Sequence, residues 1–197
     1  MRIRAAVPIV VAALLLTACS SKPTPQAAAP SSSELPPAPP VEYTQAGAGL
    51  AIGAKAIVPF SANGNVGPLG ITVTGIDKGD PADFARYGSK LEGLTPYYIK
   101  LLITNESNAD LYTLVGEIGG LLPNGKRAAP VTIFGDFAKC DRAQPPSDFA
   151  RVGKTYTSCI VAASRTGGDA IVGADYHGHP GTATPDIDYQ AKPVTWK

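Results

Sequence analysis

The chain has 197 residues, 44% of them hydrophobic, with 17 Lys and Arg against 16 Asp and Glu. A balance this close to neutral offers no basic surface for a nucleic acid, so we expect no nucleic-acid partner. Beyond the N-terminal apolar run, no stretch is long and apolar enough to span a bilayer, which argues against a transmembrane protein.

Residues 1–18 read as a signal peptide. Arg2 and Arg4 precede an uncharged apolar run over residues 5–16 that is too short to cross a membrane. The run ends in Leu16-Thr17-Ala18-Cys19, which resembles the lipobox of bacterial lipoproteins. The sequence therefore predicts export, followed by cleavage just before Cys19.

Processing at such a site attaches diacylglycerol to the thiol of Cys19 and adds an N-acyl chain to its amine. Two or more acyl chains are enough for stable anchoring. Losing Arg2 and Arg4 would leave 15 basic against 16 acidic side chains, a net charge of −1. We expect a protein anchored to the membrane by its lipid, on the outer face of the cytoplasmic membrane or in the cell envelope, with no cofactor besides that lipid.

Residues 19–40 predict a disordered linker. Beyond Cys19 the segment is mostly Ala, Ser and Pro, and it has too little apolar bulk to offset the entropy of ordering. Its prolines, which favour polyproline II, are Pro23, Pro25, Pro30, Pro36, Pro37, Pro39 and Pro40. The globular composition begins at about residue 41, which places one domain at 41–197.

The first half of that domain carries three strand signals. Residues 54–60 are short and apolar, residues 71–77 alternate in polarity, and residues 97–105 alternate most clearly, with Tyr97 and Ile99 on the same face. Between the second and third, residues 80–86 predict a short helical turn, because Asp80 suits the N-cap and proline follows it.

The second half continues the pattern after a polar turn at 105–110. Residues 111–122 and 128–134 predict two strands joined by a hairpin at Pro123-Asn124-Gly125, with Gly125 in the left-handed conformation. Residues 154–163, 170–176 and 187–196 predict the last three strands. An all-β fold follows, an antiparallel β-sandwich of about seven to eight strands.

Export also decides how the two remaining cysteines are interpreted. Cys140 and Cys159 would lie outside the cytoplasm, where disulfides persist, so a bridge between them is favoured. It would close a loop of about 20 residues and contribute about 3 kcal/mol. Two buried free thiols, or a metal or redox pair, are the alternatives, although a redox pair favours Cys-x-x-Cys spacing.

Asp175, His177 and His179 form the strongest candidate for chemistry. On a continuing strand their spacing of two would place all three on the same face. His-x-His is a metal-ligand spacing, but Asp175 and His179 would be about 13 Å apart on an extended strand, and Gly and Pro around them favour a loop. We therefore assign no metal, keep His177 and His179 as weak candidates, and assign no catalytic residue.

Several segments resemble a known group of proteins. Residues 95–105, Thr-Pro-Tyr-Tyr-Ile-Lys-Leu-Leu-Ile-Thr-Asn, resemble the central strand of actinobacterial (mycobacterial-type) cell-surface lipoproteins with an immunoglobulin-like domain. The stretch from Cys140 through Phe149 and Gly153 to Cys159, and the closing residues 193–197, are similar to that group too. The resemblance covers about residues 53–197. It implies a fold similar to the secreted mycobacterial immunoprotective antigens, and binding or envelope roles without catalytic residues.

The function expected from these observations is a non-enzymatic interaction or accessory module of the bacterial envelope, lipid-anchored and extracytoplasmic, with an envelope protein as its partner. A carrier of a small apolar ligand or lipid is the alternative, which requires a cavity between the sheets. A metal-dependent enzyme using His177 and His179 is a minor alternative.

Overall fold

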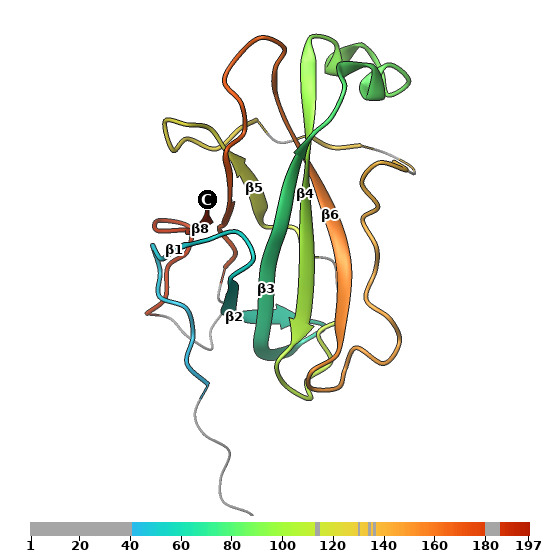
Figure 1. Cartoon of the computed structure of the whole chain (residues 1–197). Helices are drawn as coiled ribbons and strands as arrows, with labels where there is room; N and C mark the ends of the chain where they lie inside the picture. Colours follow the sequence, from blue (N-terminus) through green and yellow to red (C-terminus); the bar gives the residue numbers. More distant parts are fainter. Residues whose placement is uncertain (1–40, 113–114, 130, 134, 136, 180–185) are drawn as a thin grey trace, which may run out of the picture. The chain divides into compact units, whose positions relative to one another are not determined.

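The computed structural model describes residues 41–112, 115–129, 131–133, 135, 137–179 and 186–197. In this part of the chain, eight strands form two four-stranded sheets, and the only helices are two short 3-10 turns (Figure 1). The predicted all-β sandwich is therefore confirmed. The signal peptide, Cys19 and the linker to residue 40 lie outside the described residues. None of the described helices has the length and apolar character needed to cross a membrane.

The larger sheet has the strand order β2-β3-β4-β6 and is antiparallel throughout. Its strands are β2 (Lys55–Ala62), β3 (Asn65–Lys78), β4 (Leu94–Asn105) and β6 (Thr155–Arg165). Three of the four coincide with predicted strands, and β3 contains the predicted stretch 71–77. Strands β2 and β6 are therefore the two edges of this sheet.

The smaller sheet has the order β1-β8-β7-β5. Its strands are β1 (Gly49–Leu50), β8 (Val194–Trp196), β7 (Gly173–Tyr176) and β5 (Ile118–Leu121). Strands β1 and β8 are parallel and the other pairs antiparallel. Strand β5 is the edge of this sheet that lies toward β6.

The core fills the space between the two sheets. The larger sheet supplies the inward side chains of the predicted alternation, such as Ile99 and Leu101, and the smaller sheet supplies Tyr176 and Trp196. All four are at most 1% exposed. The indole nitrogen of Trp196 donates a hydrogen bond to the carbonyl of Ala54 at 2.9 Å, so this large side chain is buried without an unsatisfied polar group.

A second, smaller cluster covers part of the outer face of the larger sheet. It contains Phe84, Tyr98, Phe137, Cys140, Cys159 and Ala163. The 3-10 turns η1 (Pro81–Phe84) and η2 (Ser89–Leu91) lie in the connection between β3 and β4. Asp80 caps η1 as predicted, accepting a hydrogen bond from the backbone nitrogen of Ala82 at 2.8 Å.

Three predicted strands are wrong in extent. Among the described residues of 111–122 only 118–121 are strand, and of residues 187–196 only 194–196, and aspartate side chains make local hydrogen bonds to the backbone near the start of both segments. Asp110 accepts from the amide of Tyr112, and Asp188 accepts from the amides of Gln190 and Ala191. The described residues of 128–134 form no strand. Beyond the hairpin, where Gly125 is left-handed as predicted, the chain leaves β5 after Ala128.

Candidate functional site

A pocket of about 550 Å³ lies where the edge strands β5 and β6 face each other. Three short stretches supply half of the residues in its wall: residues 118–120 of β5, residues 131–133, and residues 159–162 of β6. The pocket is therefore at the open side of the sandwich, while the space between the sheet faces is filled by the core.

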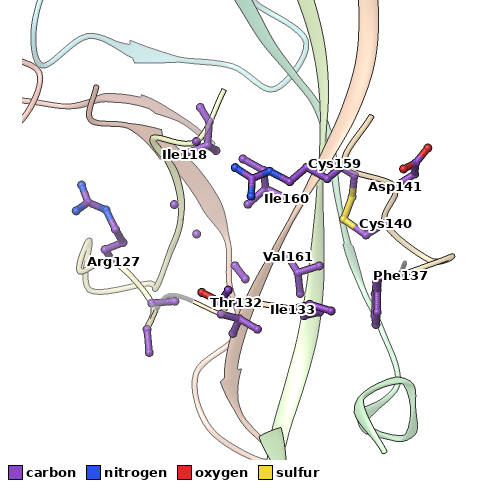
Figure 2. A pocket seen from close by; sticks show the side chains of 18 of the residues that line it. Ile118, Arg127, Thr132, Ile133, Phe137, Cys140, Asp141, Cys159, Ile160 and Val161 are labelled. Atoms are coloured by element: carbon purple, nitrogen blue, oxygen red, sulfur yellow. A yellow bond between two sulfur atoms is a disulfide. The ribbon is translucent and has the colours of Figure 1, made fainter. Parts of the chain in front are cut away.

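Aliphatic side chains share the pocket wall with polar and charged groups. Figure 2 shows Ile118, Ile133, Ile160 and Val161 around it. Glycine permits the close approach of the two sheets at its floor, because a Cβ on Gly120 would come within 2.8 Å of the Cβ of Ala162. Gly120 therefore has a packing role in this contact between the sheets.

The Cys140–Cys159 disulfide closes one side of the pocket, opposite Arg127 (Figure 2). The two cysteines are 5% and 8% exposed, and their Cα atoms are 5.1 Å apart. The predicted pairing is thus confirmed. The bridge fixes residue 140 against β6, on the outer face of the larger sheet.

The edge of β6 that faces the pocket has unpaired backbone groups. In an antiparallel pair, alternate residues point their N–H and C=O groups at the partner and the rest point them away. The amide of Thr166 bonds the carbonyl of Gly93, and the amide of Asn105 bonds the carbonyl of Lys154. In this register the even-numbered residues of β6 bond β4, so Cys159 and Val161 present their backbone groups to the free edge. No described residue forms a backbone hydrogen bond with them there.

Arg127 and Asp175, a residue of β7, form an ion pair beside the pocket. Asp175 is 1% exposed, and Arg127 donates to its carboxylate through Nε at 2.9 Å and through Nη2. Burial raises the pKa of Asp175, but contacts with His177 and Arg127 outweigh burial and hold that pKa below its ordinary value. Arg127 is the stronger partner, since Nδ1 of His177 is 3.6 Å from the carboxylate, beyond hydrogen-bond length.

The two weak candidates, His177 and His179, have different surroundings in the structure. His177 follows β7 and lines the pocket, and its buried Nδ1 has no hydrogen-bond partner among the described residues. His179 is exposed. Of the three candidates, only Asp175 and His177 come together, and Asp175 is engaged by Arg127. In the described ranges, no three His, Cys, Asp or Glu side chains gather in a way that would hold a metal ion.

Arg142 is the second arginine of the pocket wall. It is exposed, and within the part of the chain that the structure describes no carboxylate lies within ion-pair distance of it. A Cβ on Gly116 would lie 3.4 Å from its Nη2, which places the guanidinium beside the segment that leads into β5. Arg142 therefore supplies an uncompensated positive charge at the pocket, although Asp141 also belongs to the wall.

Chemically, this arrangement is suited to binding. It offers aliphatic surface, unpaired backbone donors and acceptors, and a free cation. Sequence reasoning missed Arg127, Arg142 and the role of residues 159–162. The only signal for Arg127 was its place just after the hairpin, and nothing in the sequence marks which strand is an edge.

The comparisons with known proteins give no independent guide to this site. No family model, no curated protein and no solved structure matches the chain.

Proposed function

We propose that this chain is a non-enzymatic, lipid-anchored binding module of the bacterial envelope, and that the pocket between β5 and β6 is its binding site. The lipobox at Cys19 supports the anchor and the location. The disulfide supports the location alone, because such bridges persist outside the cytoplasm.

The pocket itself is the observation that carries the proposal. Its volume of about 550 Å³ falls within the range of about 300–1,000 Å³ typical of ligand sites. It combines aliphatic side chains, which can bury apolar surface of a ligand, with charged and polar groups that can orient it.

A carrier of a small apolar ligand is the second candidate, and the same pocket favours it. The ligand would sit at the edge between β5 and β6, because the core fills the space between the sheet faces. The two candidates share a site and differ in what enters it, so one experiment tests both.

The experiment is affinity capture of the tagged, lipidated protein from its own membranes, with three forms compared. Thr132→Trp would fill the pocket from an exposed wall position, and Thr157→Trp adds the same bulk at an exposed β6 position outside the pocket. We expect wild type and Thr157→Trp to retain the same protein or lipid, and Thr132→Trp to lose it. Equal retention by all three would refute the pocket as the binding site.

The anchor has its own test. Cys19→Ala removes the thiol that would be acylated, so the variant should move from the membrane pellet to the soluble fraction. Pelleting as complete as that of wild type would contradict the proposed lipidation.

A further inference from the structure

We propose that the pocket binds an extended polypeptide segment that adds to β6 as a fifth strand of its sheet, with an acidic residue of that segment at Arg142. The inference rests on the proposed function and specifies what enters the site. An extended segment recognised at a sheet edge draws affinity from main-chain hydrogen bonds and specificity from side-chain pockets.

The backbone of β6 gives the first argument. Cys159 and Val161 point their N–H and C=O groups to the side of β6 that lines the pocket. Among the described residues these groups have no protein partner, and a backbone hydrogen bond formed with them contributes a modest net free energy. A strand lying against residues 159–162 would pair them, and no other ligand class matches the spacing of alternate backbone groups so directly.

The side chains of the pocket give the second argument. In a strand paired with β6, the residues beside Ile160 would face Ile118 on the inner side, and those beside Val161 would face Ile133 on the outer side. Both faces of the segment would therefore meet apolar surface, as in a strand covered on both sides. Beside Ala162, where Gly120 approaches closely, only a small side chain fits.

Charge gives the third argument. Arg127 is neutralised by Asp175, whereas Arg142 has no carboxylate partner among the described residues. A segment with an acidic residue at that end would supply the missing counter-charge and fix its direction in the groove. A second copy of this chain fits less well, because its 11-residue β6 needs a long free edge and the pocket exposes only residues 159–162.

The test uses peptide libraries displayed on phage and selected against the full chain held in detergent. Val161→Pro removes the N–H that faces the pocket, and edge strands tolerate proline where the N–H points outward. Val161→Ala shortens the same side chain but keeps the N–H. Thr157→Pro places proline at an equivalent outward position beyond the pocket.

We expect the selected peptides to hold consecutive aliphatic residues next to an acidic one. Val161→Pro should weaken their binding about tenfold or more, since it removes a hydrogen bond inside the pocket. Val161→Ala and Thr157→Pro should stay within about threefold of wild type, while Arg142→Glu should weaken acidic peptides about tenfold.

Two results would overturn the inference. One is the enrichment of no peptide, and the other is binding to Val161→Pro as tight as to wild type. If captured lipid is lost in Thr132→Trp but retained in Val161→Pro, strand addition is wrong while the pocket remains the binding site. If Thr132→Trp changes nothing either, the proposed function fails with it.

Discussion

The two edge strands of the larger sheet, β2 and β6, differ in whether their outward backbone groups are paired. On β2, the outward backbone groups of Ile57 are both occupied: its amide donates to Oγ1 of Thr44 at 2.9 Å, and its carbonyl accepts from the amide of Thr44 at 2.8 Å. The next outward position is Pro59, which has no N–H. On β6, Cys159 and Val161 keep both groups, and no described residue pairs them.

The difference indicates that the β6 edge is kept open for a partner. Exposed strand edges invite unwanted pairing, and proteins protect them with proline, covering segments or charge. The β2 edge is protected by proline and by the segment at residue 44. The β6 edge instead lines a pocket, and no described residue of the opposite wall forms a backbone hydrogen bond with Cys159 or Val161. Strand addition requires a strand edge whose backbone groups have no partner. The edge of β6 at Cys159 and Val161 meets that requirement among the described residues.

The largest expected difference comes from placing proline at neighbouring positions of β6, one bonded to β4 and one facing outward. Ile160→Pro removes a hydrogen bond to β4 and should destabilise the fold by about 3 kcal/mol or more. Val161→Pro removes only an outward N–H and should cost less than about 1 kcal/mol. Urea unfolding of both variants measures the two costs. Equal losses would mean that the outward orientation assigned to Val161 is wrong.

The disulfide holds the outer wall of the β6 edge, and nothing comparable holds the β2 edge. Replacing Cys140 and Cys159 together by Ser should lower the free energy of unfolding by about 3 kcal/mol, because the bridge joins residues 19 apart. The fold should survive, since the β4–β6 ladder does not depend on the bridge. Denaturant unfolding and far-UV circular dichroism measure the two effects. An unchanged midpoint would show that the bridge does not fix this wall.

A smaller effect is expected at the ion pair beside the pocket. Arg127→Ala leaves the buried carboxylate of Asp175 without its main partner and should cost about 2 kcal/mol at pH 7, a figure reduced because the Arg127 side chain is 40% exposed. Lys126→Ala, at the exposed neighbouring residue, is the matched control and should cost almost nothing.

The pH dependence of that loss has a definite sign. Because the folded state lowers the pKa of Asp175, its stabilisation is present above the unfolded value of about 3.9 and is lost as the pH falls through the folded pKa. The stability difference between wild type and Arg127→Ala should therefore shrink below about pH 4. A difference that stays constant from pH 7 to pH 3 would exclude the carboxylate as its source.

The sequence predicted the larger sheet well and the smaller sheet poorly. Residues 97–105 alternate over their whole length because one face packs on the core, and that pattern is visible in the residue types. Strands β5, β7 and β8 have only three or four residues each, too few for a clear period. Their limits are set by tertiary pairing and by aspartates such as Asp188, whose side chain turns the chain locally.

The candidate site was less predictable than the fold. The cysteine count and the predicted export pointed to the Cys140–Cys159 bridge, but neither places it in the wall of a pocket. The spacing of Asp175 and His177 pointed to β7, which lies beside the pocket. The partner of Asp175 comes from residue 127, and a contact across 48 positions has no local signal in the sequence.

Amide hydrogen exchange along β6 tests the open edge most directly. In the free protein, the amides of Cys159 and Val161 should exchange much faster than those of Ile160 and Ala162, which bond β4, and faster than that of Ile57 on β2. With a selected peptide bound, Cys159 and Val161 should become protected while Thr157 is unchanged. Slow exchange at Cys159 and Val161 in the free protein, or no gain in their protection on binding, would contradict the account.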